Sequence, residues 1–186
     1  MAQMTNMDND ILKVLITREQ LSTRIAELGR QLSEDYDGKD VILVCILKGA
    51  VHFFSDLSRQ MTCHMEMDFM GISSYGNSSK TSGIVRISKD MDTSITNRHV
   101  LIVEDIMDSG LTLNHLVNVL KMRQPASLKI ACLLDKPQRR ECEISPDYVG
   151  FVIPNEFVVG YGLDCESFYR NLPYVGVMKP EVYSGA

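Results

Sequence analysis

One stretch of the chain indicates its architecture and its chemistry together: Val100-Leu-Ile-Val-Glu104-Asp105-Ile-Met-Asp108-Ser109-Gly110-Leu111-Thr112. Its first four residues are apolar and mostly β-branched, which is typical of a strand buried on both faces. Glu104 and Asp105 follow at the carboxyl end of that strand. A polar loop comes next, and apolar residues at 113, 116, 117 and 120 then have the spacing of a helix. The stretch therefore predicts a strand, a polar loop and a helix in succession.

The sequence on either side continues this alternation. Thr17 and Gln20 match a capping box, and a helical pattern follows them until Asp37 and Gly38. Residues 71–83 are polar over an unusual length, and we expect them to form a functional loop. Strand–helix alternation predicts an α/β fold with a largely parallel sheet, in which ligands bind at the carboxyl ends of the strands. Further strands are predicted over residues 41–47, 65–70, 84–88, 128–134, 148–153 and 157–160, and a helix over residues 50–61.

The composition sets the broad class of protein. The chain has 186 residues, of which 45% are hydrophobic, so we expect one globular domain. The net charge of -5 argues against a general nucleic-acid binder. No apolar run approaches the length of a membrane span, and Met1–Asp10 lacks the pattern of a signal peptide. The five cysteines form no C-x-x-C pair and fit reduced structural thiols. We therefore expect a cytoplasmic protein without a membrane partner.

The loop after residue 105 has the composition of a phosphate site. Ser109 and Thr112 supply hydroxyls, Gly110 permits close approach, and the following helix directs its N-terminus at an anion. Glu104 and Asp105 suit a sugar diol or Mg²⁺ instead. Together these groups predict a site for a phosphorylated sugar. The alternative is that Asp108 or Ser109 only caps the helix, but crowded carboxylates are unfavourable without a cation or a bound ligand.

The same stretch resembles the phosphoribosyl-diphosphate (PRPP) motif of type I phosphoribosyltransferases, and residues 16–177 resemble the hypoxanthine(-guanine) phosphoribosyltransferases. The resemblance also rests on Leu47-Lys48-Gly49, Ser74-Tyr75, Leu134-Asp-Lys136 and the run from Val149 to Asp164 with Arg170 after it. It implies one domain over residues 1–186, with a twisted, largely parallel sheet flanked by helices. The core would cover about 35–150. A small hood would combine the N-terminal segment with about 151–186, and a lid loop would span about 71–83, beginning at Ser74 and Tyr75.

The resemblance implies transfer of the 5-phosphoribosyl group from PRPP to hypoxanthine and also to guanine, which gives IMP or GMP and pyrophosphate. Mg²⁺ would be held directly by Asp164, and by Glu104 and Asp105 either directly or through water. Lys48, Gly49 and Arg170 would bind pyrophosphate. A cis peptide is implied at Leu47–Lys48. The ribose and the 5′-phosphate would be bound by Glu104, Asp105, Asp108, Ser109, Gly110, Leu111 and Thr112.

The implied base site lies later in the chain. Lys136 would donate to the 6-oxo group of the purine, and this would exclude adenine. Phe157 would stack on the base, Val158 would supply backbone groups, and Asp164 would complete the site. Asp108 would accept the ring proton of the purine. Taken alone, Lys136 could be a surface lysine and Phe157 a core aromatic.

Three other functions remain open from the sequence. One is a regulatory RNA-binding protein on the same fold, which the acidic charge disfavours. Another is a transferase for xanthine or uracil, against which Lys136 and Phe157 argue. An unrelated Mg²⁺-dependent phosphatase would have no use for Lys136 and Phe157. The resemblance also implies a homodimer or a homotetramer.

Overall fold

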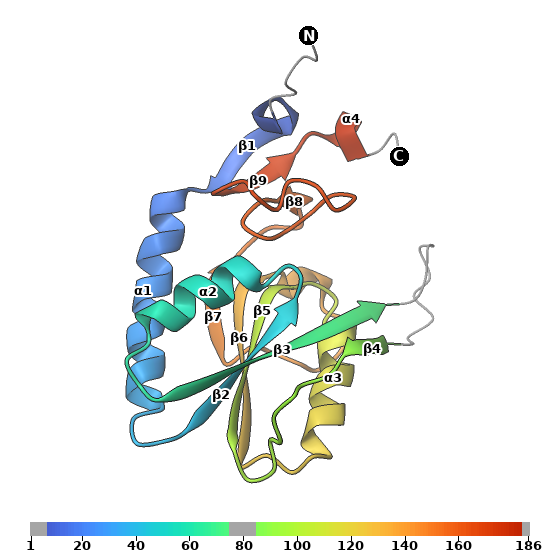
Figure 1. Ribbon diagram of the computed structural model, residues 1–186. Coiled ribbons are helices and arrows are strands. Elements are labelled where there is room, and N and C mark those ends of the chain that lie inside the picture. Colours follow the sequence, from blue (N-terminus) through green and yellow to red (C-terminus); the bar gives the residue numbers. More distant parts are fainter. Residues whose placement is uncertain (1–6, 75–84, 184–186) are drawn as a thin grey trace.

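A six-stranded sheet forms the centre of the computed structural model, which describes residues 7–74 and 85–183 (Figure 1). A second, three-stranded sheet lies above one end of it. The helical elements are η1 (Met7–Asp10), α1 (Arg18–Asp35), α2 (Val51–Gln60), α3 (Leu111–Lys121), η2 (Pro137–Arg139) and α4 (Pro180–Tyr183). The strands are β1 (Ile11–Ile16), β2 (Val41–Leu47), β3 (Met65–Ser74), β4 (Val85–Lys89), β5 (His99–Met107), β6 (Ser127–Asp135), β7 (Tyr148–Val152), β8 (Val158–Val159) and β9 (Val175–Met178).

The central sheet has the strand order β4-β3-β2-β5-β6-β7. All neighbouring strands in it are parallel except β3 and β4, which form an antiparallel edge. The predicted α/β fold with a largely parallel sheet is therefore confirmed. Since β2, β5 and β6 run in the same direction, the residues that follow them meet at one edge of the sheet.

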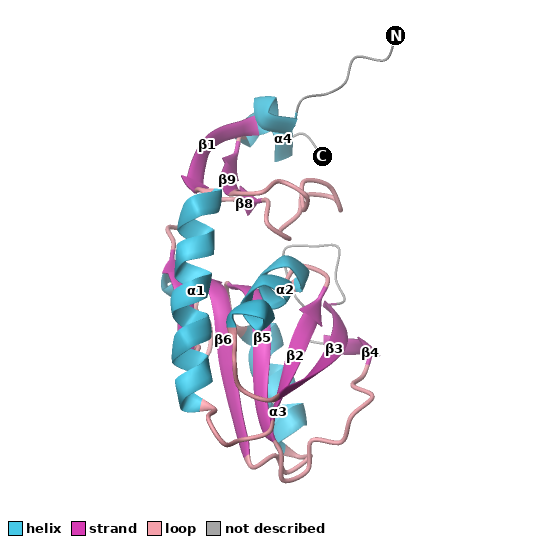
Figure 2. Cartoon of the chain, turned by 60° about the vertical axis from the view of Figure 1, so that its left-hand side comes forward, coloured by secondary structure: helices cyan, strands magenta, loops and turns pink. Residues whose placement is uncertain are grey.

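Alternate residues of β2 enter different hydrophobic cores. Val41, Leu43 and Cys45 pack with α1 and α2, whereas Ile42 and Val44 pack with α3. The first six residues of this strand are buried, which explains its uninterrupted apolar sequence. Figure 2 shows the sheet between α1 and α2 in front and α3 behind.

The capping box predicted at the start of α1 is present. The backbone N–H of Gln20 donates to Thr17 Oγ1 at 3.3 Å, and the backbone N–H of Thr17 donates to Gln20 Oε1 at 2.8 Å. Two otherwise unpaired donors are satisfied in this way. Across residues 7–74 and 85–183, none of the helices is long and apolar enough to span a membrane.

The second sheet joins both ends of the chain. Its order is β1-β9-β8, and both strand pairs are antiparallel. Val158, Val175 and Val177 on one face of it belong to the same hydrophobic core as α1 and α2. The opposite face packs a smaller cluster around Val159 and Met178. This sheet is consequently fixed over the carboxyl ends of the central strands, as both ribbon views show (Figures 1 and 2).

Several predicted boundaries were wrong by a few residues. β5 continues to Met107 because it pairs with β6 as far as Asp135, so the two acids lie within the strand. β3 continues to Ser74 because it pairs with β4, so residues 71–74 are strand and not loop. The remainder of the expected lid, including Tyr75, lies outside the described residues. The strand predicted over 157–160 is only Val158–Val159.

Candidate functional site

Glu104 and Asp105 form a crowded acidic pair near the end of β5. Glu104 Oε2 is buried and has no hydrogen-bond partner. Burial, the charge of Asp105 and a hydrogen bond with Asp105 raise the pKa of Glu104 well above its usual value. Burial also raises the pKa of Asp105, although the backbone N–H of Ile106 donates to its Oδ1 at 2.8 Å and opposes this. A cation or a hydroxyl-bearing ligand would relieve the crowding.

The predicted phosphate loop lies between β5 and α3. Its Gly110 has φ 80° and occupies the N-cap position of α3, where no side chain caps the helix. Ser109 Oγ accepts only a 3.4 Å hydrogen bond from the N–H of Leu111. The alternative in which Asp108 or Ser109 serves as an ordinary cap is therefore not supported. A cavity of about 200 Å³ opens here, lined in part by Asp108, Ser109, Gly110 and Thr112.

The segment after η2 packs against this loop and donates hydrogen bonds to its backbone. Arg140 Nη1 donates to the carbonyl of Asp108 at 2.7 Å, and its Nη2 also pairs with Asp135. The N–H of Glu141 donates to the carbonyl of Ser109 at 2.9 Å. A Cβ on Gly110 would lie 3.0 Å from Arg140 Cδ. Arg140 was not predicted as a site residue, and its only signal in the sequence is its place four residues after Lys136.

The turn after β2 lies against the acidic pair. The peptide between Leu47 and Lys48 is cis, as the sequence analysis predicted. A Cβ on Gly49 would lie 1.6 Å from Asp105 Oδ2, so any larger residue at this position would displace that carboxylate. A cavity of about 580 Å³ extends from this turn, and its lining includes Lys48, Gly49, Glu104, Asp105, Asp164 and Arg170.

Asp164 and Arg170 reach this cavity from the loop between β8 and β9. Arg170 Nη2 lies 2.6 Å from Asp164 Oδ1, and its Nη1 donates to the carbonyl of Gly162 at 2.5 Å. Asp164 Oδ2 accepts from the N–H of Ser167 at 2.8 Å. A Cβ on Gly162 would lie 1.9 Å from the carbonyl oxygen of Gly49, so this loop contacts the turn directly. The structure thus brings the predicted pyrophosphate and metal residues to one cavity.

The acidic side chains at the larger cavity suit a Mg²⁺ ion that also keeps ligands from water or substrate. The buried, unpartnered oxygen of Glu104 and the carboxylates of Asp105 and Asp164 are hard donors facing one cavity. Within the described part of the chain, no three His, Cys, Asp or Glu side chains form a metal cluster. Mg²⁺ commonly keeps waters and substrate phosphates as ligands beside one or two carboxylates. The donor set fits an ion that arrives with a phosphorylated ligand.

One of the predicted purine residues, Lys136, lies beside the phosphate loop. The backbone N–H of Lys136 donates to the carbonyl of Met107, and Lys136 Nζ donates to the carbonyl of Glu156 at 2.8 Å. Lys136 is buried, and burial lowers its pKa, which the charge of Asp108 opposes. Phe157 follows Glu156 directly and is 39% exposed. Lys136 is therefore buried and is not the surface lysine of the alternative interpretation.

Asp108 is paired with an arginine that the sequence analysis did not select. Arg139 Nε lies 2.6 Å from Asp108 Oδ1, and both side chains remain partly exposed. Arg139 Nη1 also donates to Asn155 Oδ1 at 3.4 Å. Arg139 stands at the end of η2, three residues after Lys136. The only signal for it in the sequence was a pair of arginines close behind a candidate site lysine.

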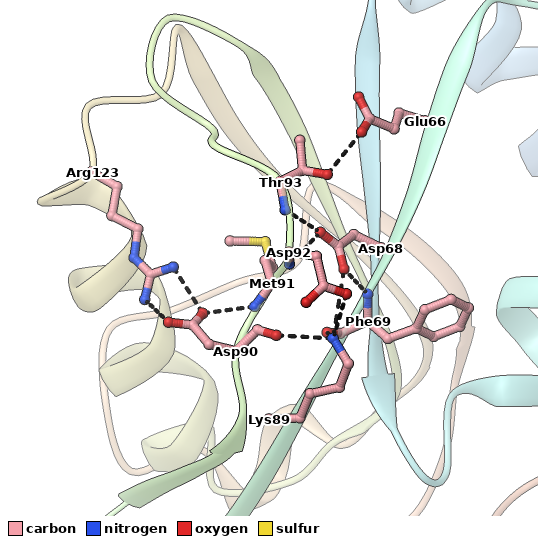
Figure 3. A network of polar contacts seen from close by, with 9 residues as sticks. All are labelled: Glu66, Asp68, Phe69, Lys89, Asp90, Met91, Asp92, Thr93 and Arg123. Atoms are coloured by element: carbon pink, nitrogen blue, oxygen red, sulfur yellow. Dashed lines mark hydrogen bonds and ion pairs between the residues drawn. The ribbon is translucent and has the colours of Figure 1, made fainter.

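The lining of the larger cavity also includes Lys89, which a buried carboxylate helps to place (Figure 3). Asp68 is 4% exposed and accepts from the N–H groups of Phe69, Asp92 and Thr93 at 2.7, 3.0 and 2.9 Å. Lys89 Nζ donates to the carbonyl of Phe69 at 3.1 Å and lies 3.9 Å from Asp68 Oδ1. Asp68 thereby ties the segment after β4 to β3. This network was not predicted, because its members are distant in the sequence and match no local motif.

Comparison with known proteins agrees with this geometry. A model of the phosphoribosyl transferase domain matches residues 16–166. The chain belongs to this family. It is 51% identical over 177 residues to a hypoxanthine-guanine phosphoribosyltransferase of Bacillus subtilis, and the match covers 95% of this chain and 98% of that protein. The structure is similar to that of a hypoxanthine phosphoribosyltransferase of Staphylococcus aureus, with a TM-score of 0.93, 49% identity, and coverage of 97% and 99% of the two chains.

A longer relative is also similar. The chain is 54% identical over 179 residues to the bifunctional protein TilS/HprT of Listeria monocytogenes, and the match covers 96% of this chain but only 28% of that protein. The predicted membership among the hypoxanthine(-guanine) phosphoribosyltransferases is confirmed by these matches.

Proposed function

We propose that the chain transfers the 5-phosphoribosyl group of PRPP to hypoxanthine, and also to guanine, with release of pyrophosphate. The names of the similar proteins from Bacillus subtilis and Staphylococcus aureus support this activity. One structural observation supports it most strongly. The backbone N–H of Lys136 donates to the carbonyl of Met107, next to Asp108, and Asp108 lines the smaller cavity, so the proposed base site would adjoin the proposed phosphate site. Such an arrangement suits a nucleoside 5′-monophosphate.

The phosphorylated sugar would lie across the two cavities, which share Glu104 and Thr112 in their linings. The N–H groups at the start of α3 and the hydroxyls of Ser109 and Thr112 would donate to the 5′-phosphate, with Gly110 and Leu111 supplying backbone. Carboxylates at the end of β5 would accept from the ribose hydroxyls. This assignment follows from the uncapped N-terminus of α3, which attracts an anion.

The leaving pyrophosphate would occupy the larger cavity. Arg170 offers a planar fork of donors, and the Lys48–Gly49 turn offers backbone groups beside it. Glu104, Asp105 and Asp164 would hold Mg²⁺, directly or through water. When bound, this ion would neutralise negative charge on the diphosphate. Because Arg170 and Asp164 are ion-paired, binding of the diphosphate would exchange one partner of Arg170 for another.

The purine would lie between Lys136 and Phe157, with Val158 supplying backbone groups. The ammonium of Lys136 donates and cannot accept, so it would favour a 6-oxo group over a 6-amino group. Asp108 would accept the ring proton as the purine attacks the anomeric carbon. The ion pair with Arg139 holds one oxygen of Asp108, and the purine would approach the other.

A panel of bases tests this proposal. The purified protein is incubated with PRPP, Mg²⁺ and, in turn, hypoxanthine, guanine, xanthine, adenine and uracil, and pyrophosphate release is followed. We expect turnover with hypoxanthine and guanine only. Turnover with xanthine or uracil alone would reassign the base. Absence of turnover with every base, together with a mobility shift of RNA at low salt, would favour the RNA-binding alternative.

The assembly and the location of the protein belong to the same proposal. We infer a homodimer or a homotetramer in the cytoplasm, with no nucleic-acid or membrane partner. The net charge of -5 supports the exclusion of nucleic acid. Light scattering after size-exclusion chromatography measures the oligomeric state, and a monomeric mass at micromolar concentration would contradict it.

A further inference from the structure

The proposed base-stacking residue is itself stacked on another ring. The ring centroids of Phe157 and Tyr183 lie 4.6 Å apart, and their planes are inclined by 25°. Tyr183 is the last residue of α4, next to the C-terminus, and 26 positions separate it from Phe157. A planar ring has two faces, and Tyr183 covers one face of Phe157. Phe157 is 39% exposed, in agreement with a partly open ring.

Tyr183 is held in place by contacts that do not involve Phe157. It packs, with its neighbour Val182, on the cluster around Val159 and Met178. The residue before α4, Lys179, donates its backbone N–H to the carbonyl of Asp10 at 2.9 Å. The short helix is therefore anchored to η1 at its start and to the second sheet at its end.

Phe157 has fixed backbone contacts on both sides. The carbonyl of Phe157 accepts from the N–H of Met178 at 3.0 Å, and the preceding carbonyl, of Glu156, accepts from Lys136 Nζ at 2.8 Å. The backbone position of Phe157 is thus linked to the residue that would read the 6-oxo group. These backbone contacts do not fix the side-chain torsions of Phe157. Stacking on Tyr183 restricts the rotation of the Phe157 ring.

We propose that Tyr183 is a positioning residue for the purine base. This inference rests on the proposed function. Tyr183 stacks on the face of Phe157 that is turned away from the base and fixes the ring plane on which the base stacks. Offset aromatic pairs contribute beyond their buried area, so loss of the ring would loosen base binding and leave binding of the phosphorylated sugar unchanged.

The test separates the base from the sugar phosphate. Dissociation constants for IMP and for ribose 5-phosphate are measured by calorimetry on the full chain and on Tyr183→Ala, Tyr183→Leu and Tyr183→Phe. We expect about two- to tenfold weaker IMP binding for the alanine and leucine variants, from the usual strength of an aromatic pair. Tyr183→Phe keeps the ring and should match the unmodified chain. Ribose 5-phosphate should bind all four proteins equally.

Steady-state kinetics give a second readout. Tyr183→Leu should raise KM for hypoxanthine by a similar factor, with kcat and KM for PRPP nearly unchanged. Glu181→Ala, an exposed change on the same short helix, serves as the control for disturbance of the C-terminus. Tyr183→Leu keeps apolar volume in the cluster and decides the question if Tyr183→Ala is poorly folded.

Three outcomes would overturn the inference. Tighter binding of IMP to Tyr183→Ala would mean that Tyr183 occupies the place of the base. Equal losses for IMP and ribose 5-phosphate would mean that Tyr183 serves only stability. Unchanged binding of both would mean that Tyr183 does not position Phe157. Failure of the unmodified chain to bind IMP would contradict the proposed function instead, so the two failures are distinguishable.

Discussion

At the scale of single residues, Asp108 combines a partly exposed carboxylate with a fixed backbone. Arg140 holds its carbonyl, and Arg139 holds one of its side-chain oxygens. We predict that Asp108→Asn lowers kcat for hypoxanthine by about 10²- to 10⁴-fold, the usual contribution of a general base. Binding of IMP should change little, because an amide keeps the shape and polarity of the side chain. Calorimetry with IMP and pyrophosphate release measure the two effects.

Asp37→Asn provides the matched control for Asp108→Asn, since it removes one exposed carboxylate far from the site. It should keep full turnover. Near-normal turnover of Asp108→Asn would exclude Asp108 as the proton acceptor.

Lys136 carries a second prediction at this scale. A glutamine at this position can both donate and accept, whereas lysine only donates. Lys136→Gln should therefore lower kcat/KM for hypoxanthine and raise the ratio of adenine to hypoxanthine use, by about tenfold or more. Base-panel kinetics measure the ratio. An unchanged preference against adenine would show that other groups exclude the 6-amino base.

Residue identity was predictable from the sequence where it follows a local motif. The acids of β5 and the glycine-bearing loop lie within a short run with a clear chemical pattern. The cis peptide at Leu47–Lys48 was expected from the family resemblance alone. Arg139 and Tyr183 were not predictable in the same way. Their partners, Asp108 and Phe157, lie 31 and 26 positions away, and only the fold brings each pair together.

At the scale of elements, the contact between β3 and the segment after β4 depends on one buried carboxylate. Burial alone would raise the pKa of Asp68, but hydrogen bonds from three backbone N–H groups and the charge of Lys89 outweigh it, so the pKa lies below its usual value. Asp68→Asn replaces one acceptor oxygen by a donor that faces backbone donors. We predict a loss of about 1–3 kcal/mol in the free energy of unfolding at pH 7, measured by urea denaturation.

The loss in the free energy of unfolding caused by Asp68→Asn should depend on pH in one direction. Because the folded pKa of Asp68 is depressed, its charged form stabilises the fold above the ordinary value of 3.8, and this contribution is lost as the pH falls through the lower folded pKa. The stability gap between the unmodified chain and Asp68→Asn should therefore narrow in strong acid. Asp92→Asn, with a side chain that is 87% exposed, should show almost no gap at any pH. If the difference in the free energy of unfolding between the unmodified chain and Asp68→Asn stayed constant with pH, the charge of Asp68 would not be its cause.

Among the elements, those with a marked apolar or amphipathic pattern were predictable, including the five-residue strands β4 and β7. β2 and the start of α1 were placed correctly because burial on both faces and a capping box leave strong patterns. β1 and β9 were not expected as strands. β9 has only four residues, and it becomes a strand because β1 and β8 pair with it on either side. Pairing between distant segments leaves no periodic signal in either one.

At the scale of the whole molecule, the second sheet and the central sheet share a hydrophobic core, and the loop after β8 also lies close to the turn after β2. Gly162 has φ 104°, and a Cβ there would lie 1.9 Å from the carbonyl oxygen of Gly49. Gly38 also has a positive φ, 68°, but a Cβ there would meet nothing within 4 Å. Alanine substitutions at these two glycines therefore separate the effect of backbone strain from the effect of a steric clash.

We predict that Gly38→Ala and Gly162→Ala both lose about 1–2 kcal/mol of stability from left-handed backbone strain, and that only Gly162→Ala also impairs the site. Its Cβ must push the loop that carries Asp164 and Arg170 away from the Lys48–Gly49 turn, and displacements of about 1 Å can lower turnover by about 10²-fold. KM for PRPP should rise as well, since the residues that would bind diphosphate no longer face one cavity. Urea denaturation and initial rates measure both effects, and equal kinetics for the two variants would mean that this contact does not set the geometry of the site.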